Sequence, residues 1–268
     1  MSLAYDESGW RTPRLDSAAA RRPLASRTRA AEARDLLTEA ISRHGRRLAL
    51  VSSFGAESAV LLHLAAALDP TIAVLFLDTG MLFGQTLDYR KSLTRRLGLA
   101  NVRDLRPSAE DLALADPAGD LWRGDPDACC GARKVVPLER ALAGFDAWIT
   151  GRKRFQAAER LHLPVVEQAK GKTKYNPLAN WSPAELEAYA RAHDLPSHPL
   201  AAAGFSSIGC WPCTTPVEKG EQARAGRWRG SEKTECGIHG RLRATVVGAA
   251  RERTKTGSVS WIAPATDR

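Results

Sequence analysis

Five cysteines, arranged as two close pairs and one single residue, have the clearest chemical potential in this 268-residue chain. The pairs are the adjacent Cys129 and Cys130 and the Cys-x-x-Cys of Cys210 and Cys213, and Cys236 stands apart from them. Four thiols in two tight pairs are typical ligands of zinc or of an iron–sulfur cluster. Zinc sites usually separate the thiols of a pair by two or more residues, so the adjacent pair favours a cluster. The spacing alone leaves three interpretations open: a zinc site, an iron–sulfur cluster, or five unrelated buried cysteines that bind no metal.

The single cysteine, Cys236, is a candidate nucleophile. An ordinary thiol with a pKa near 8.5 is only about 3% thiolate at pH 7, and a pKa about two units lower would make most of it reactive. The positive field for such a shift could come from nearby basic residues, namely Lys233, His239, Arg224 and Arg227. Glu235 would oppose a thiolate, so we expect its carboxylate to point away from the sulfur.

A second group with chemical potential is a loop rich in serine between an apolar run and a helical pattern. Residues 51–58 read Val-Ser-Ser-Phe-Gly-Ala-Glu-Ser. In a parallel sheet such a loop lies at the carboxyl edge, where hydroxyl groups, a glycine and the free N–H groups of a helix start can bind phosphate. An ordinary turn with serine caps is the alternative. The next apolar run is followed by Asp78 and Thr79, which favours a phosphate site at that edge.

The elements that must position these residues alternate between strands and helices. Apolar runs predict strands over 48–51, 72–77, 101–105 and 147–150, and helical patterns cover 31–44, 57–68, 86–97, 127–142 and 183–193. Ser182-Pro-Ala-Glu185 is a capping box with proline at the first helical position, which marks the start of the last helix. Strands that alternate with helices of ten or more residues predict an α/β fold with a mainly parallel sheet.

The chain divides into four parts by composition. Residues 1–30 are expected to be a flexible leader rich in Ala, Arg, Ser and Pro, and their acidic residues argue against a transit peptide. Residues 31–200 are expected to form a nucleotide-binding domain. Residues 201–240 are expected to be an irregular segment that carries the Cys-x-x-Cys and Cys236. Residues 241–268 are expected to form a basic tail, either ordered or disordered.

Composition limits the class of protein. Hydrophobic residues make up 44% of the chain and charged residues 26%, which is typical of a globular protein. An excess of 39 Lys and Arg over 30 Asp and Glu gives a net charge of +9 and favours an anionic partner. No apolar run approaches the roughly 20 residues of a membrane helix. Five cysteines are too few for a secreted disulfide scaffold, so we expect a cytoplasmic protein with no membrane partner.

Seven segments of the chain resemble the phosphoadenylyl-sulfate and adenylyl-sulfate reductases, a family of the PP-loop superfamily. The first is the loop Ser52-Ser-Phe-Gly-Ala-Glu-Ser58, which is similar to the family's modified PP-loop. The others follow in the family's order: Leu77 to Gly80, Cys129 to Leu138, Trp148 to Arg154, Lys174 to Leu178, Ile208 to Thr214 and Lys233 to His239. Seven segments in order are highly specific, and they leave residues 1–40 and 241–268 uncovered.

The resemblance implies a PP-loop fold and the reduction of adenylyl sulfate (APS) to sulfite and AMP in assimilatory sulfate reduction. In the family the cysteine that corresponds to Cys236 attacks the sulfate sulfur, AMP leaves, and an S-sulfocysteine remains. Thioredoxin or a similar dithiol then releases sulfite. Members with the Cys-Cys and Cys-x-x-Cys set carry a four-iron four-sulfur (4Fe–4S) cluster and prefer APS, which implies a cluster on Cys129, Cys130, Cys210 and Cys213. We expect its role to be electrostatic and structural.

The resemblance also implies a set of substrate-binding residues. They are Ser52, Ser53, Phe54, Gly55, Ser58, Asp78, Thr79, Lys134, Gly151, Arg160, Arg224, Arg227 and His239. Lys134 is expected between the cluster and the substrate. The last four are expected at the phosphosulfate, which carries about two negative charges, because arginine forks suit paired oxygens. Phe155 departs from the family, whose members are often acidic at that position.

Three other functions remain as alternatives. Relatives that use the 3′-phosphorylated substrate (PAPS) usually lack the four cluster cysteines, so a PAPS reductase or a dual-specificity enzyme is the first alternative. ATP-cleaving PP-loop enzymes normally have a Ser-Gly-Gly-x-Asp-Ser loop, from which Phe54 and Glu57 depart. A zinc-stabilised nucleic-acid binder would suit the charge, but the basic residues form no helical stripe with interleaved aromatics, so no nucleic-acid partner is expected. Family members are often homo-oligomers, which makes a homo-oligomer a further expectation.

Overall fold

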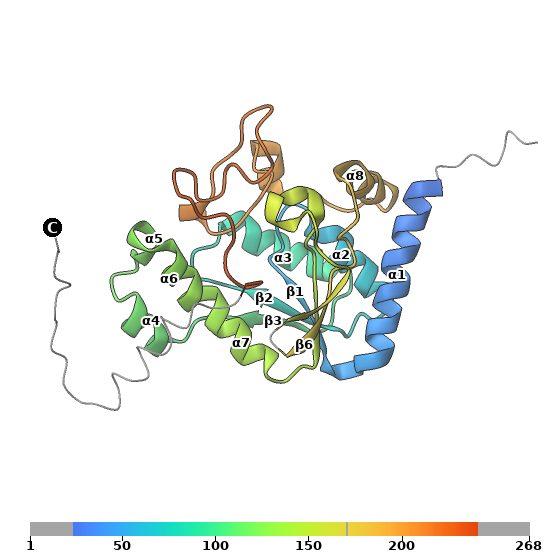
Figure 1. The fold of residues 1–268 in the computed structure, drawn as a ribbon, viewed down its shortest axis with the longest axis horizontal. Helices are drawn as coiled ribbons and strands as arrows, with labels where there is room; N and C mark the ends of the chain where they lie inside the picture. Colours follow the sequence, from blue (N-terminus) through green and yellow to red (C-terminus); the bar gives the residue numbers. More distant parts are fainter. Residues whose placement is uncertain (1–23, 170, 241–268) are drawn as a thin grey trace, which may run out of the picture.

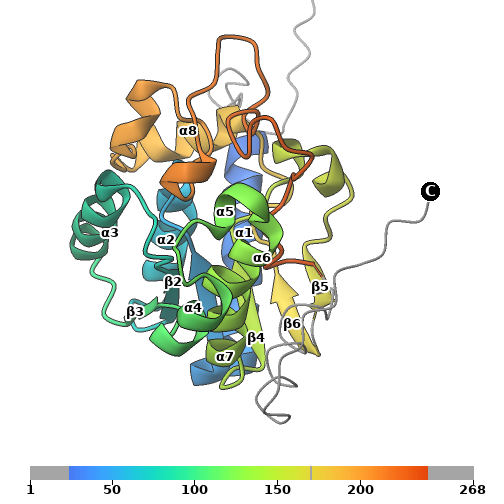
Figure 2. The ribbon, with the colours of Figure 1, turned by 90° about the vertical axis from the view of Figure 1, so that its left-hand side faces the viewer.

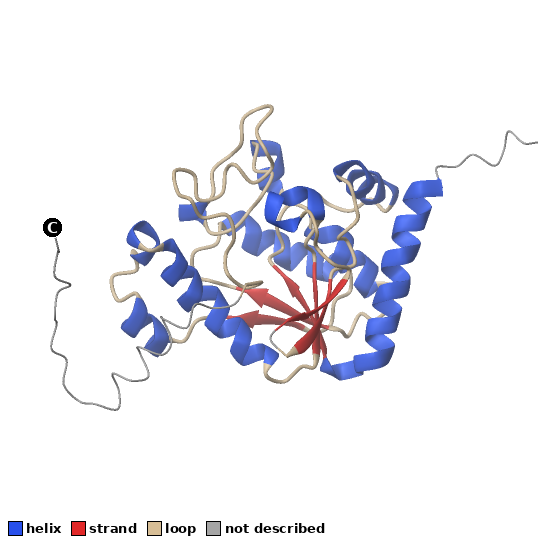
Figure 3. Ribbon diagram, viewed as in Figure 1, coloured by secondary structure: helices blue, strands red, loops and turns tan. Residues whose placement is uncertain are grey.

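A six-stranded sheet with helices on both faces forms the centre of the molecule (Figure 1, Figure 3). The computed structural model describes residues 24–169 and 171–240. The strand order is β3-β2-β1-β4-β6-β5, and all pairings are parallel except that of β5 with β6. The strands are β1 (Leu48–Ser52), β2 (Ala73–Leu77), β3 (Val102–Leu105), β4 (Ala147–Thr150), β5 (Val166–Ala169) and β6 (Lys172–Tyr175). The prediction of a mainly parallel α/β fold is confirmed.

The five predicted helices are present, with differences at their ends, and two short helices between residues 109 and 124 were not predicted. The helices are α1 (Leu24–His44), α2 (Ser58–Ala66), α3 (Gly84–Arg96), α4 (Ala109–Ala115), α5 (Leu121–Gly124), α6 (Pro126–Cys130), α7 (Val136–Leu142) and α8 (Pro183–Ala192). A π-helical segment, Gly131–Val135, joins α6 to α7, so the helix predicted over 127–142 is continuous but locally wider. Ser182 caps α8 by the predicted capping box. None of the helices in the described ranges is long and apolar enough to cross a membrane.

The sheet is buried on both faces, which explains why its central strands are continuously apolar. Successive residues of a strand point to opposite faces. Leu50 of β1 therefore belongs to one core cluster, with residues of α1, α2 and α8, whereas Val51 belongs to a second cluster with α7. All five residues of β1 and of β2 are buried.

The strand order creates a switch point between β1 and β4. From β1 the chain continues through β2 and β3 on one side, and β4 and β6 lie on the other side. Ligands of open parallel sheets bind at the carboxyl ends of the strands at such a point. Residues 199–240 are irregular apart from the short helices Pro199–Ala203 and Trp211–Cys213. Most of this segment lies above the sheet in both views, and its end descends beside the strands (Figure 1, Figure 2).

Two further features of the fold differ from the sequence prediction. The last strand that the sequence predicts is 147–150, so β5 and β6 are additional, and their segments Val-Glu-Gln-Ala and Lys-Thr-Lys-Tyr lack an apolar run. Helix α1 begins at Leu24 rather than at residue 31, so the last residues of the expected leader are helical. The rest of that leader, residues 1–23, and the expected basic tail, residues 241–268, lie outside the described residues.

Candidate functional site

A cavity of about 210 Å³ lies at the switch point between β1 and β4. The predicted substrate-binding residues that line it are Ser52, Ser53, Gly55, Ser58, Thr79, Lys134, Gly151, Arg160, Arg224, Arg227 and His239, and the predicted nucleophile Cys236 lines it as well. Ser52 ends β1, Ser53 and Gly55 lie in the turn that follows, and Ser58 begins α2. Arg224, Arg227, Cys236 and His239 come from the irregular segment. The fold therefore gathers residues that are up to 187 positions apart in the sequence, from Ser52 to His239.

Two predicted substrate residues do not line the cavity, and their contacts explain why. The Phe54 ring is fully buried and packs edge-on against Phe76 at 5.4 Å between ring centroids. Its backbone has a φ of 48°, a conformation that turns the chain sharply from β1 into α2. The Asp78 carboxylate is buried and accepts hydrogen bonds from Gly80 N and Arg106 Nε at 3.1 and 2.9 Å. Both side chains support the loops that face the cavity.

The cavity walls carry an excess of positive charge. Six basic residues of the described chain line it, against the two carboxylates of Glu57 and Glu235: Lys134, Arg152, Lys153, Arg160, Arg224 and Arg227. Burial would lower the pKa of Lys134, but its electrostatic interactions with Cys210, Cys130 and Cys236 outweigh that effect and raise the pKa. Such a wall suits an anionic ligand, since few counter-charges within the cavity compete for it.

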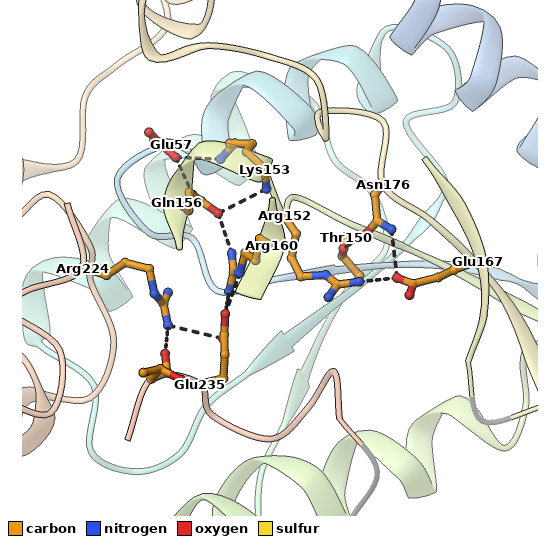
Figure 4. A network of polar contacts seen from close by, with 11 residues as sticks. Glu57, Thr150, Arg152, Lys153, Gln156, Arg160, Glu167, Asn176, Arg224 and Glu235 are labelled. Atoms are coloured by element: carbon orange, nitrogen blue, oxygen red, sulfur yellow. Dashed lines mark hydrogen bonds and ion pairs between the residues drawn. The ribbon is translucent and has the colours of Figure 1, made fainter. Parts of the chain in front are cut away.

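A continuous network of polar contacts runs along one wall (Figure 4). Glu57 Oε2 accepts from Lys153 Nζ at 2.7 Å and from Gln156 Nε2 at 2.8 Å. Gln156 Oε1 in turn accepts from Arg160 Nη1 at 2.5 Å, and Arg160 Nε donates to Glu235 Oε1 at 2.6 Å. The network therefore connects the loop after β1 to the residue that precedes Cys236.

The carboxylate of Glu235 lies between two arginines. Arg160 Nη2 is 2.5 Å from Oε1, and Arg224 Nη2 is 3.3 Å from Oε2 (Figure 4). Burial would raise the pKa of Glu235, but the hydrogen bond from Arg160 and the charges of Arg160, Arg224 and Arg152 outweigh it and lower that pKa. Glu235 is expected to point away from the Cys236 sulfur, and its contacts with Arg160 and Arg224 balance its charge within the cavity wall.

The segment that carries Cys236 is docked on the rest of the molecule at several points. Lys233 forms an ion pair with Asp127 of α6. His239 stacks on Trp148 of β4, with ring centroids 5.8 Å apart and an angle of 15° between the planes. Ile238 packs against the core cluster that contains α7. These contacts hold Cys236, which is partly exposed, at the cavity wall.

His239 does not supply the positive charge expected of it. Burial, followed by the charges of Lys174, Arg152, Arg160 and Arg224, lowers the pKa of His239 well below its usual value. The ring is therefore neutral at physiological pH. Its Nδ1 is buried and has no hydrogen-bond partner within the described residues, although the residue lines the cavity. A neutral imidazole at this position can still form a hydrogen bond with a bound ligand.

The four paired cysteines come from two structural elements. Cys129 and Cys130 end α6, Cys210 directly precedes the short helix Trp211–Cys213, and Cys213 is its last residue. The backbone of Cys210 forms an antiparallel β-bridge with Leu82, and its sulfur lies 3.2 Å from Thr79 Oγ1. Burial raises the pKa of Cys129 to about 12, and the charges of Cys130 and Cys210 add to this effect.

The donor set suits a metal cluster, although the thiols are not closely grouped. No three His, Cys, Asp or Glu side chains lie close enough to hold one metal ion in the part of the chain that the structure describes. The thiols of the two pairs nevertheless lie near enough for Cys210 to affect the pKa of both Cys129 and Cys130. Four thiols of this kind, three of them buried, are the ligands that an iron–sulfur cluster requires.

Gly209 couples the second cysteine pair to the cavity wall. A Cβ at Gly209 would lie only 2.3 Å from Arg227 Nη2, so the absence of a side chain lets the guanidinium pack against the backbone beside Cys210. The same guanidinium lies over the Trp228 ring, with Cζ 4.4 Å from the centroid. Arg227 is thus fixed between the cysteine pair and the cavity.

Comparison with known proteins places this architecture in a family. A family model described as the phosphoadenosine phosphosulfate reductase domain matches residues 47–216. The chain belongs to this family. A relative from Mesorhizobium japonicum named adenosine 5′-phosphosulfate reductase is 52% identical, over 75% of this chain and 81% of the relative. A relative from Gloeobacter violaceus named phosphoadenosine 5′-phosphosulfate reductase is 42% identical, over 76% of this chain and 87% of the relative.

A solved structure of the same family supports the fold. The phosphoadenylyl-sulfate (PAPS) reductase from Candida auris, crystallised as a phosphate complex, is 30% identical and has a TM-score of 0.57. The match covers 69% of this chain and 90% of the Candida auris chain. The resemblance drawn from seven sequence segments is therefore confirmed at the level of the family.

Sequence reasoning missed several residues of this reductase-family cavity. Glu57, Lys153 and Gln156 line it and form the start of the polar network. Glu57 and Lys153 lie inside the segments that resemble the family, so the sequence could have marked both as site residues. Their ion pair could not be predicted, because 96 positions separate them and only the fold brings them together. Arg154, a basic residue of the same segment, donates to Leu163 O instead and does not line the cavity.

Proposed function

We propose that this chain reduces APS to sulfite and AMP, with Cys236 as the nucleophile and a thioredoxin-type dithiol as the reductant. The observation that carries the proposal is that Cys236 lines the same cavity as the PP-loop-like serines and six basic side chains. A nucleophile beside a strongly basic cavity suits attack on an anionic centre, because the cations offset the repulsion between thiolate and substrate.

The proposed reaction has two steps. The Cys236 thiolate attacks the sulfur of APS, the bond from sulfur to the bridging oxygen breaks, and AMP leaves with that electron pair. Cys236 then carries a sulfo group as S-sulfocysteine. One thiolate of the dithiol attacks the Cys236 sulfur and releases sulfite, and its second thiol resolves the mixed disulfide. The dithiol loses two electrons, the sulfur gains two, and Cys236 returns to a thiol.

The residues of the cavity wall have distinct parts in this proposal. Ser52, Ser53 and Ser58 supply hydroxyl groups at the start of α2 for the nucleotide phosphate. Arg160, Arg224 and Arg227 supply forked N–H donors for the phosphosulfate oxygens. Lys134, which is buried and charged, stabilises negative charge as the AMP oxygen leaves.

A 4Fe–4S cluster belongs to the same proposal. Cys129, Cys130, Cys210 and Cys213 would hold it, and when bound it supplies a structural cross-link and an electrostatic field beside the cavity. Lys134, Arg227 and Thr79 connect this group of thiols to the cavity, as the charge coupling of Lys134, the packing of Arg227 on Gly209 and the contact of Thr79 with the Cys210 sulfur indicate. Reduced thiols of this kind fit a cytoplasmic setting.

PAPS is the second candidate substrate. The relative from Gloeobacter violaceus carries the PAPS reductase name at 42% identity, and a cavity with six basic side chains has charge to spare for an added phosphate. APS is favoured because the chain has both cysteine pairs and because the relative from Mesorhizobium japonicum, at 52% identity, carries the APS reductase name.

The test compares both substrates with an enzyme of known iron content. The protein is purified anaerobically, iron and labile sulfide are measured, and sulfite release from APS and from PAPS is followed with reduced thioredoxin. We expect iron and sulfide near four per chain, turnover of APS, and no sulfite from Cys236→Ser, which should still bind AMP and iron. Turnover of PAPS alone by an iron-free protein would overturn the assignment to APS.

A further inference from the structure

Glu235 occupies the position in the cavity wall where the substrate's anionic groups are proposed to bind. Its two carboxylate oxygens contact Arg160 and Arg224, at 2.5 and 3.3 Å. Two arginine groups on one carboxylate form the same kind of site that binds a phosphate or sulfate group. In this structure the chain itself therefore supplies the anion for these two arginines.

The contact joins the wall of the cavity to the segment that carries Cys236. Arg160 belongs to the domain that contains the sheet, and its side chain is 9% exposed. Glu235 directly precedes Cys236 in the sequence. Arg224 Nη2 also donates to the carbonyl oxygen of Thr234 at 2.7 Å, which holds the backbone of the same segment. We call Glu235 with Arg160 and Arg224 the carboxylate latch.

The latch differs from the other contacts that dock this segment. Lys233 pairs with Asp127 on α6, Ile238 packs on the core, and His239 stacks on Trp148. A ligand phosphosulfate would compete with none of these three partners for charge. Among these four contacts only the latch is an ion pair formed by basic residues that line the cavity, because His239, which also lines it, is neutral and contacts Trp148 by stacking. An anion that enters the cavity therefore competes directly with the latch carboxylate.

Two positions are required of Cys236 under the proposed function, on which this inference rests. Its sulfur must reach the substrate inside the cavity, and it must later reach a dithiol protein outside. We propose that Glu235 is a positioning residue that competes with the substrate's anionic groups for Arg160 and Arg224, so that substrate binding loosens the segment carrying Cys236. In this exchange one anion replaces another on the same two arginines, so neither guanidinium is left without an anionic partner.

The latch also has a connection to the loop that follows β1. Arg160 Nη1 donates to Gln156 Oε1, and Gln156 Nε2 donates to Glu57 Oε2 at 2.8 Å (Figure 4). Gln156 therefore fixes the Arg160 fork from the opposite side. When the Glu235 carboxylate leaves, Arg160 keeps its orientation toward the cavity and remains available to the ligand.

The test uses full-length holoenzyme with Cys236→Ser in every sample, so that APS is bound but not consumed. E235Q removes the latch charge, and E235D keeps the charge on a shorter side chain. E232Q is the matched control, because Glu232 is an exposed acid three positions away in the same segment. Hydrogen exchange of residues 231–240 is measured without nucleotide, and APS affinity is measured by calorimetry.

We expect E235Q to show about three- to tenfold faster exchange in residues 231–240 and about three- to tenfold tighter APS binding, the size of a partly exposed ion pair. E232Q and E235D should bind APS within about twofold of the parent. A purely structural role would loosen the segment but weaken APS binding, since Arg160 and Arg224 would lose their positions. Weaker or unchanged binding in E235Q overturns the proposal, and so does unchanged exchange.

The two readouts separate this inference from the proposed function. If the parent C236S protein binds no APS, the proposed function fails. The exchange comparison between E235Q and E232Q requires no nucleotide, so it still decides whether Glu235 holds the segment. If APS binds the parent but E235Q changes neither readout, the function stands and the latch is wrong.

Discussion

At the scale of single residues, the site depends on forked cations more than on charge alone. Arg160 uses three of its nitrogen atoms, with Nη1 on Gln156 and both Nε and Nη2 on Glu235. A lysine at this position would keep the charge but could not hold two partners in fixed directions. The side chain of Arg160 is therefore oriented before a ligand arrives, which lowers the entropy that binding must overcome.

We expect Arg160→Lys to raise the KM for APS about tenfold, the effect of losing one charge-assisted hydrogen bond of about 1.5 kcal/mol. Sulfite release at several APS concentrations checks this expectation. Arg154→Lys is the matched control, because Arg154 is an exposed arginine of the same segment whose Nε donates to Leu163 O at 2.9 Å, away from the cavity. Equal KM values for the two variants would remove Arg160 from the proposed binding site.

The sequence predicted residues of the cavity where chemistry and chain position coincide. Serines after a strand, a lysine in a matched segment and a lone cysteine could all be found in this way, and Ser52, Lys134 and Cys236 do line one cavity. Pairings across the fold could not be found. Glu235 was expected to point away from the Cys236 sulfur, but its partners Arg160 and Arg224 could not be predicted, because only the three-dimensional arrangement brings them together.

At the scale of elements, the prediction succeeded where burial imposes a pattern. Strands β1, β2 and β4 are buried along their whole length, so their apolar runs stand out in the sequence. Strands β5 and β6 contain polar residues whose burial depends on specific partners, such as Lys174, which is fully buried and pairs with Glu167 at 3.2 Å. Such strands carry no apolar signal, and the antiparallel edge of the sheet therefore went unpredicted.

His198 joins two elements, and its contacts require a neutral ring. Leu200 N donates to His198 Nδ1 at 3.1 Å, so the ring proton lies on Nε2, which donates to Thr86 Oγ1 of α3 at 3.1 Å. Burial lowers the pKa of His198 from 6.5 to about 4. The unfolded chain therefore binds more protons than the folded chain at weakly acidic pH, and folding stability falls as the pH drops from about 6.5 towards 4.

We expect His198→Asn to reduce this pH dependence while lowering stability at pH 7.5. Between pH 7.5 and pH 5 the free energy of unfolding of the parent should fall by about 2 kcal/mol more than that of the variant. Urea denaturation at both pH values measures the difference. Contributions from other titrating groups, including His239, cancel in the comparison. Parallel losses of stability in parent and variant would show that His198 titrates normally in the folded chain.

At the scale of the whole molecule, the net charge of +9 has a partial explanation. Six basic side chains face one cavity, and they come from the π-helical segment, the region after β4 and the irregular segment. A nucleic-acid surface is expected to present its basic residues as a stripe along one helix. These six side chains come from three separate segments and form no such stripe. Basic groups that converge on a concave site instead focus the field on a small anion and raise its local concentration.

This field makes the reaction rate sensitive to salt in a specific way. Mobile ions shorten the Debye length to about 10 Å at 0.1 M ionic strength, so the attraction of the cavity for a distant anion weakens as salt is added. Contacts inside the cavity are screened less, because several of the basic side chains are almost fully buried, Lys134, Lys153 and Arg160 among them.

We therefore expect kcat/KM for APS to fall about tenfold between low and 0.3 M sodium chloride, whereas kcat changes less than twofold. Thermal unfolding at the same salt concentrations controls for loss of structure, and binding of uncharged adenosine should not weaken with salt. A constant kcat/KM across this range would mean that the convergent cations act only at contact distance and do not steer the substrate.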